Sequence, residues 1–451
     1  MSGTVKSVLL LLFIVVAFVL FQVATFVEVN GVFSIRPNMS LWTKEDSSIQ
    51  KEIVYEGKKV IPGRAKPAIV ILDAEKPAVQ ELPLPTTKLS PTTAVPALTK
   101  KVFHYPGNRR TALVIVAYNR PQYLKRTMTS LINTLSSPLN DVIVDIVLSQ
   151  DGYLTILDDV VKEMEDRIHK DLPQFQFSHI HHTQENNPGE SGYHKLSRHF
   201  GWFLGQMFDV KHYDQVIVLE DDLEMAPDFF SYFDNTAPLL WKDPTLFCVS
   251  AWNDNGQEDH VSDKTRLYRS DFFPGLGWML TKNLWNELGS KWPPAYWDDW
   301  LRHPDRRHNR SCIRPEVCRT YTFGEKGTSN AQFYGQYLRS IKLNDAFVDF
   351  SKQDMNKLMK DEYDANWRSI IDQAKTVSSL NEIPPNSPES FKILYENNNI
   401  NRGFVYYARS LRIMTDEKAG VWRTAYMKVV AVKYQGTQVY LVPMDGPNFN
   451  Y

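Results

Sequence analysis

Short apolar runs alternate with helical patterns through the middle of the chain. Residues 112–117 and 216–219 are uninterrupted apolar runs, and "VIVDIVLSQDG" and "TLFCVSAWNDNG" repeat the arrangement with polar residues at the end. Such runs are typical of parallel strands that are buried on both faces. Segments with helical spacing separate these strands: one follows Pro121, and the others cover residues 154–169 and 200–208. The stretch "FQFSHI" adds a short apolar segment. Repeated strand–loop–helix units predict an α/β fold with a mainly parallel sheet.

Polar residues stand where four of these predicted strands end. They are Asn119-Arg120, Asp151, Glu220-Asp221-Asp222 and Asn253-Asp254-Asn255. Ligands of open α/β sheets bind beyond the carboxyl ends of the strands, so we expect a binding site here. The chain has no GxGxxG after its first strand and no GxxxxGKS, which disfavours a nicotinamide site and a P-loop.

The carboxylate triplet in "DQVIVLEDDLEMAPDFF" is the most informative of these strand ends. Three adjacent carboxylates repel one another, so a positive partner is expected beside them. Hard divalent cations prefer oxygen ligands, and one carboxylate at a strand tip leaves coordination positions open for phosphate and water. The alternative is a solvated acidic turn, which the preceding buried strand disfavours.

The two ends of the chain differ from its middle. Residues 8–27 carry no charge and are long enough to span a bilayer, which predicts a signal-anchor behind a cytoplasmic tail of residues 1–7. A cleaved signal peptide is the alternative. Residues 28–105 are polar and Pro-rich, as expected of a lumenal stem, and contain the sequon Asn38-Met39-Ser40. We expect a catalytic domain over 106–345 and a smaller α+β domain over 346–451, with a hairpin at Gln435-Gly436.

Charge and cysteine content narrow the possible functions. The chain has 51 basic and 52 acidic residues, so nothing in its overall charge favours nucleic-acid binding. Its cysteines are Cys248, Cys312 and Cys318, and the sequence alone permits three pairings. No Cys/His cluster suggests zinc.

Several longer motifs occur in a recognisable order. "VIVLEDDLEMAPDFFSYF", "FCVSAWNDNG", "DFFPGLGWML", "KWPPAYWDDW" and "FGEKGTSNAQF" resemble the N-acetylglucosaminyltransferase I family. The resemblance runs from about residue 111 to about residue 350 and more weakly beyond. It implies a GT-A fold, a Golgi membrane enzyme with a lumenal catalytic domain, UDP-GlcNAc as donor, Mn²⁺ as cofactor and an inverting reaction. The implied acceptor is the Man5GlcNAc2 N-glycan of glycoproteins.

The resemblance also implies roles for residues around the donor. Asp222 would bind Mn²⁺, Asp221 the ribose and Glu220 the GlcNAc. The remaining donor positions are Arg120 and Asp151 for uracil and ribose, His199 for a further contact, Leu276 beside the sugar, Ser329 near the phosphates, and Arg310 for the covering loop or the diphosphate. The resemblance also pairs Cys248 with Cys312 and leaves Cys318 free.

On the acceptor side, the resemblance implies that Asp298 is the catalytic base and that Trp297 shapes the acceptor pocket. An inverting attack on an α-linked donor needs one base for the acceptor hydroxyl and an electrophile on the leaving side, so two separate acidic sites are expected. Without the resemblance, "WDDWL" reads equally well as a helix N-cap.

Three alternative functions remain at this point. An enzyme that adds GlcNAc to O-linked mannose on protein is the nearest, although its relatives carry an extra carbohydrate-binding domain before the catalytic part. A catalytically inactive lectin of the secretory pathway is disfavoured by the acidic residues. A metal-dependent hydrolase is disfavoured because no His-rich site is evident.

Overall fold

The computed structural model describes residues 109–183, 187, 189–328, 332–397 and 399–447, which belong to one compact unit, Ala94–Tyr451. The predicted membrane span, the stem with its sequon and Ser329 lie outside the described residues. Among the helices of the described residues, none combines the length and the apolar character needed to cross a membrane.

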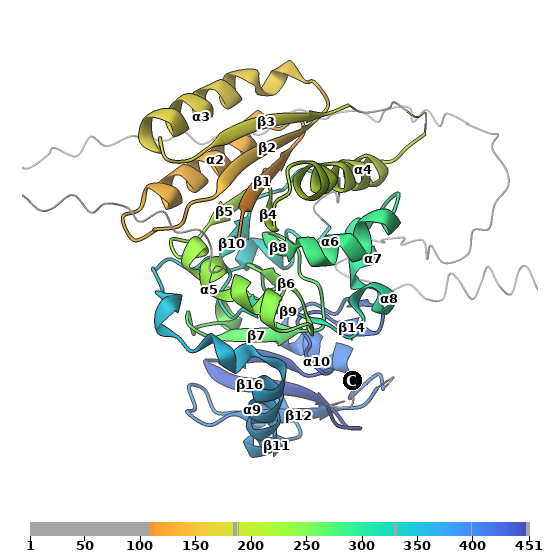
Figure 1. Cartoon of the computed structure of the whole chain (residues 1–451). Coiled ribbons are helices and arrows are strands. Elements are labelled where there is room, and N and C mark those ends of the chain that lie inside the picture. The colour runs from red at the N-terminus through yellow and green to blue at the C-terminus, as the bar shows by residue number, and fades with distance from the viewer. Residues whose placement is uncertain (1–108, 184–186, 188, 329–331, 398, 448–451) are drawn as a thin grey trace, which may run out of the picture. The chain divides into compact units, whose positions relative to one another are not determined.

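An eight-stranded sheet forms the centre of the fold, in the order β3-β2-β1-β4-β8-β6-β9-β7 (Figure 1). Its strands are β1 Thr111–Ala117, β2 Asp145–Asp151, β3 Phe177–His182, β4 Gln215–Glu220, β6 Leu246–Ser250, β7 Leu267–Ser270, β8 Trp278–Thr281 and β9 Ser311–Pro315. The α/β class is as predicted, and β1 pairs parallel with β2 and β4, as does β2 with β3. However, β8 runs antiparallel to both β4 and β6, and β7 runs antiparallel to β9, so the sheet is mixed.

The helices cover both faces of this sheet, as the buried strands require. They are α2 Pro121–Ser136, α3 Asp158–Asp171, α4 Gly192–Gly205, α5 Phe229–Lys242, α6 Lys282–Leu288, α7 Trp297–Arg302 and α8 Pro304–Arg307. Leu113 and Ile115 of β1 share one apolar cluster with α2 and α3, whereas Ala112 and Val114 share another with α4. Alternate residues of a strand point to opposite faces, which explains why this run carries no polar residue. Figure 1 shows α2 and α3 on one side of β1–β3 and α4 on the other.

The C-terminal region builds a second sheet, in the order β11-β12-β16-β15. Its elements are β11 Lys375–Val377, β12 Phe391–Tyr395, β15 Val430–Tyr434 and β16 Thr437–Pro443, with α9 Lys360–Gln373 and α10 Phe404–Leu411. The predicted hairpin is present: β15 and β16 pair antiparallel, and Gln435 and Gly436 turn the chain with φ of 49° and 78°. Trp367 and Tyr440 of this region belong to the same apolar cluster as Ile115 of β1, so one continuous core crosses residue 345.

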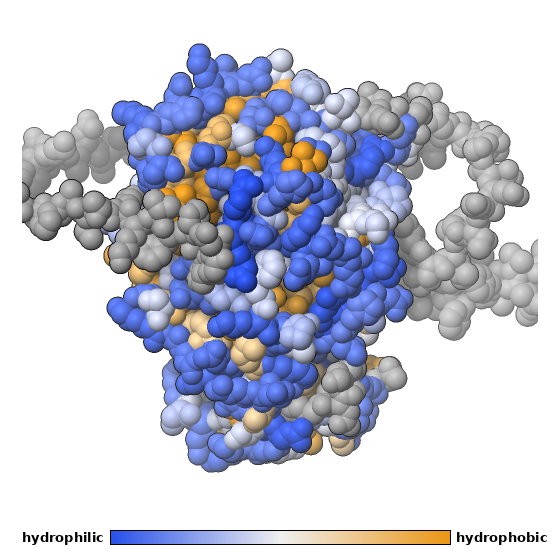
Figure 2. Space-filling model, viewed as in Figure 1, coloured by the Kyte–Doolittle hydropathy of each residue, from blue (hydrophilic) through white to orange (hydrophobic). Residues whose placement is uncertain are grey.

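Two smaller strand pairings and a disulfide add to the described part of the chain. β5 Leu223–Met225 pairs with β10 Thr320–Thr322, and β13 Glu417–Lys418 pairs with β14 Val421–Trp422. Cys248 and Cys312 stand opposite each other on β6 and β9 and form a disulfide, which confirms the implied pairing. Cys318 is buried and free. The face in Figure 2 is largely hydrophilic, and its apolar residues lie in separate patches.

Candidate active site

A pocket of about 410 Å³ opens at the carboxyl ends of β1, β2 and β4. Six of the predicted donor-site residues line it: Arg120, Asp151, His199, Glu220, Asp221 and Asp222. Each of them follows or ends a strand, except His199, which lies on α4. Parallel strands end at a common edge, and this geometry brings residues together that lie far apart in the sequence.

The positive partner of the acidic triplet is Arg120. Its guanidinium hydrogen-bonds the Asp221 carboxylate, lies 3.0 Å from Asp222 Oδ2 and donates to the Lys326 carbonyl at 2.6 Å. Burial raises the pKa of Glu220 to about 8, and Asp222 adds to this effect while Arg120 opposes it. Burial also raises the pKa of Asp221 to about 7, despite the opposing charge of Arg120. At both carboxyls, burial therefore outweighs the opposing charge of Arg120.

The acidic cluster fits a divalent cation in donor type. Its ligand atoms are carboxylate oxygens, which hard cations prefer. The backbone of Gly324 lies directly against the Asp222 carboxylate, and a Cβ at that position would collide with Asp222 Oδ2. A glycine therefore keeps this side of Asp222 clear of a covering side chain. In the part of the chain that the structure describes, no group of three or more His, Cys, Asp or Glu side chains is placed to hold a metal ion.

Histidines support the wall of the pocket on the β2 side. His182 Nδ1 lies 2.8 Å from Asp151 Oδ1, and His199 Nε2 lies 2.8 Å from Ser149 Oγ. The two imidazoles stack with centroids 5.5 Å apart. Burial lowers the pKa of His199 to about 4, so this ring is neutral at neutral pH. The sequence analysis missed His182, although period-two spacing with the inward-facing Ile180 places it on the same face.

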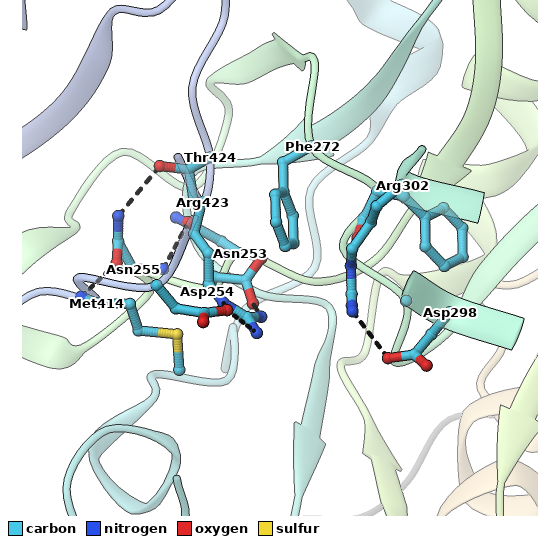
Figure 3. Close-up of polar contacts among 12 residues, drawn as sticks. Asn253, Asp254, Asn255, Phe272, Asp298, Arg302, Met414, Arg423 and Thr424 are labelled. Carbon is cyan, nitrogen blue, oxygen red and sulfur yellow. Dashed lines mark hydrogen bonds and ion pairs between the residues drawn. The ribbon is translucent and has the colours of Figure 1, made fainter. Parts of the chain in front are cut away.

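Asp298 lies at the start of α7, with its side chain about 40% exposed. Arg302, one turn later, donates to Asp298 Oδ2 at 2.7 Å (Figure 3). It also donates to Asp299 Oδ1 at 2.8 Å. Arg302 is itself held, because it donates to the Phe273 carbonyl at 3.1 Å and lies 4.8 Å from the Phe272 ring centroid. Asp298 also contributes to the raised pKa of Glu220, so the two carboxylates are within electrostatic range of each other.

The neighbouring Asp299 has a different environment. Lys418 of β13 donates to Asp299 Oδ2 at 3.0 Å. Burial alone would raise the pKa of Asp299, but its hydrogen bonds with Lys418 and Arg302 outweigh burial and lower it. Asp299 is thus paired with two cations and Asp298 with one, although the two side chains are equally exposed, at 39% and 40%.

Besides Asp298, four predicted site residues are not among the described residues that line the pocket. Trp297 is only 6% exposed and stacks on Phe200 with centroids 4.2 Å apart, so it is a core residue in this structure. Arg310 forms a two-pronged ion pair with Glu287, at 2.7 and 2.9 Å. Leu276 has a φ of 47° in a turn whose carbonyl accepts from Thr320 Oγ1 at 2.6 Å. Ser329 is outside the described residues, although Thr328 lines the pocket.

The fourth polar strand end has a structural role. Asp254 pairs with Arg423 at 2.6 Å, and Asn255 donates to Thr424 Oγ1 at 3.0 Å and accepts from the Met414 N–H at 3.2 Å (Figure 3). None of these asparagine and aspartate side chains is among the described residues that line the pocket. The expectation that residues 253–255 contribute to the binding site is therefore not met. They instead join the end of β6 to the C-terminal region.

The protein has an α/β fold with acidic residues clustered at the carboxyl edge of its sheet. A separate carboxylate, that of Asp298, is partly exposed nearby. The GNT-I family model matches residues 8–450, and the chain belongs to this family. A curated relative from Arabidopsis thaliana, alpha-1,3-mannosyl-glycoprotein 2-beta-N-acetylglucosaminyltransferase, is 41% identical over 343 residues, which is 74% of each chain.

Two solved structures show a more distant likeness. The mannosyltransferase PcManGT from Pyrobaculum calidifontis, in complex with GDP-Man and Mn²⁺, has 15% identity and a TM-score of 0.34, over 53% of this chain and 65% of its own. TarS 1-349 from S. aureus, in complex with UDP, has 12% identity and a TM-score of 0.31, over 47% of this chain and 60% of its own.

Proposed function

We propose that this protein transfers GlcNAc from UDP-GlcNAc, with inversion, to O2 of the α-1,3-linked mannose of the Man5GlcNAc2 N-glycan. The product would carry GlcNAc in β linkage and would be the precursor of hybrid and complex N-glycans. Membership of the GNT-I family and the 41% identical relative carry this proposal. The pocket supports it, because a buried acidic cluster and a separate accessible carboxylate are what an inverting transfer requires.

The donor half of the site would hold UDP-GlcNAc in a GT-A fold. Asp222 would bind Mn²⁺, which when bound would stabilise the charge that develops on the departing diphosphate. Asp221 would contact the ribose, Glu220 the GlcNAc, and the pair Arg120 and Asp151 the uridine. His199 would meet the donor as a neutral ring, because burial lowers its pKa to about 4.

The acceptor half would centre on Asp298. The mannose hydroxyl oxygen attacks the anomeric carbon from the face opposite UDP, and the bond from that carbon to the diphosphate oxygen breaks as the new bond forms. The hydroxyl proton passes to Asp298, and UDP leaves with the electron pair. Arg302, at 2.7 Å from Asp298, holds the carboxylate in place for this step.

We also propose that residues 8–27 anchor the protein in the Golgi membrane as a single-pass type II protein and that residues 28–105 form a lumenal stem. The apolar run without a charge supports the anchor. The Cys248–Cys312 disulfide supports a lumenal location, since disulfides persist in oxidising compartments.

One assay with the full chain in detergent tests the activity. The enzyme is incubated with UDP-GlcNAc, Mn²⁺ and either a Man5 glycan or an O-mannosyl peptide, and the linkage in the product is read by NMR. We expect β-1,2-linked GlcNAc on the Man5 glycan. Transfer to the O-mannosyl peptide alone would replace the proposal with that enzyme class, and glycan binding without transfer would identify a lectin.

A further inference from the structure

Two tyrosines stack between the pocket and the base. Tyr193 lies on α4 and lines the pocket, and Tyr296 immediately precedes α7. Their ring centroids are 4.5 Å apart with an interplanar angle of 28°. The sequence analysis assigned neither residue a role.

Tyr296 combines a strained backbone with an exposed aromatic ring. Its backbone is left-handed, with φ of 51° and ψ of 48°, and its side chain is 50% exposed. A bulky residue at positive φ costs roughly 1–2 kcal/mol, and glycine or asparagine is the usual solution. The turn places the next residue, Trp297, in the core and leaves the Tyr296 ring half in solvent. Strain of this kind is typical of functional sites.

The stacked pair also lies beside the reacting groups. Asp298 comes two positions after Tyr296, and the charges of Asp298, Asp299 and Lys418 all act on the Tyr193 hydroxyl. Tyr193 shares the pocket with Glu220, the residue proposed to face the transferred sugar. The two rings therefore stand where the donor pocket meets the carboxylate that would receive the acceptor proton.

We propose that the Tyr193–Tyr296 pair is the acceptor platform of this enzyme: the apolar C–H face of the terminal mannopyranose packs on the exposed Tyr296 ring and presents its hydroxyl to Asp298. An aromatic ring suits this task because it offers a large rigid apolar surface beside polar groups. The assignment rests on the proposed function, since it names the residues that would recognise the acceptor at the same site. It gives Tyr296 the role that the sequence analysis gave to Trp297.

Steady-state kinetics of the full chain tests this platform with matched substitutions. Tyr296→Gly removes the ring and suits the left-handed backbone, so the fold should be retained. We expect acceptor KM to rise roughly tenfold, as loss of one stacking contact implies. The KM for UDP-GlcNAc should stay the same, and the melting temperature should not fall. Tyr296→Phe should restore the acceptor KM, and Tyr406→Ala, at a 47% exposed tyrosine on α10, is the control.

Several outcomes would overturn the platform. They are an unchanged acceptor KM in Tyr296→Gly, an equal rise in both KM values, and failure of Tyr296→Phe to restore acceptor binding. Saturation-transfer NMR of the Man5 glycan with the wild-type protein separates this proposal from the proposed function. If the wild type binds the glycan but transfers nothing, the transfer activity is wrong. If Tyr296→Gly then binds the glycan as well as the wild type does, the platform is wrong too.

Discussion

Nδ1 of His182 lies 2.8 Å from Oδ1 of Asp151, so a histidine beneath the pocket holds a carboxylate that lines it. We expect His182→Ala to raise the KM for UDP-GlcNAc about fivefold, as the loss of one hydrogen bond of about 1 kcal/mol implies. The kcat should change little, because His182 would touch neither reacting atom. Initial rates over a donor titration measure both values. His169→Ala, on the exposed side of α3, is the control, and an unchanged donor KM in His182→Ala would show that Asp151 does not need this partner.

Asp298→Asn should keep UDP binding and lose transfer. An amide cannot accept the acceptor proton, and general-base catalysis contributes about 10²–10⁴ in rate. Calorimetric titration with UDP and a GlcNAc-transfer assay measure the two properties separately. Asp299→Asn is the matched variant, because Asp299 is already bound to Lys418 and Arg302. Near-normal turnover in Asp298→Asn would reject Asp298 as the base.

Asp222→Ala should weaken UDP binding in the presence of Mn²⁺ and leave binding without metal nearly unchanged. The substitution removes the proposed cation ligand and keeps the Arg120–Asp221 contact. UDP titrations with Mn²⁺ and with EDTA measure the difference. If Mn²⁺ strengthens UDP binding as much in the variant as in the wild type, another residue holds the cation.

The metal-free protein should lose stability as the pH rises through the range in which Glu220 titrates. Burial raises the pKa of Glu220 to about 8, so the folded state binds more protons than the unfolded state between the ordinary glutamate range and that value. Stability then falls as pH rises across this window. Glu220→Gln should flatten the melting temperature between about pH 5 and about pH 8, whereas Glu362→Gln on the exposed face of α9 should not. A steeper profile in Glu220→Gln would contradict the assignment.

Trp297→Ala should destabilise the fold strongly. The indole stacks on Phe200 and Trp278 within the core, and truncating such a residue costs about 3–5 kcal/mol. Denaturant unfolding measures the loss, and Tyr296→Gly is the adjacent comparison, for which we expect no comparable loss. Equal stability of the two variants would mean that Trp297 is not the packing residue of this pair.

The sequence predicted the parts of the fold that follow from local pattern. Uninterrupted apolar runs located β1 and β4, and the polar residues after them located Arg120 and the acidic triplet in one pocket. Pattern could not reveal that β8 enters the sheet antiparallel between β4 and β6, because strand direction depends on contacts far along the chain.

Side-chain roles were harder to predict wherever the sequence offers two residues of similar chemistry. Tyr296 and Trp297 are both aromatic, and only the left-handed turn at Tyr296 decides which ring is buried. Arg310 and Arg120 are both cations near a strand, but Glu287 lies beside Arg310 and the acidic triplet beside Arg120. Such differences arise from tertiary neighbours that are distant in sequence.

The Phe272 ring lies between two guanidiniums, with Arg302 at 4.8 Å and Arg423 at 4.9 Å from its centroid (Figure 3). Lys418 reaches Asp299 from the same C-terminal region. A fragment ending at residue 345 would therefore retain all the pocket residues around the acidic triplet but lose two supports of the Asp298 helix. Because the apolar core also crosses residue 345, shortening this protein from its C-terminus would remove part of that core together with the supports of the proposed base.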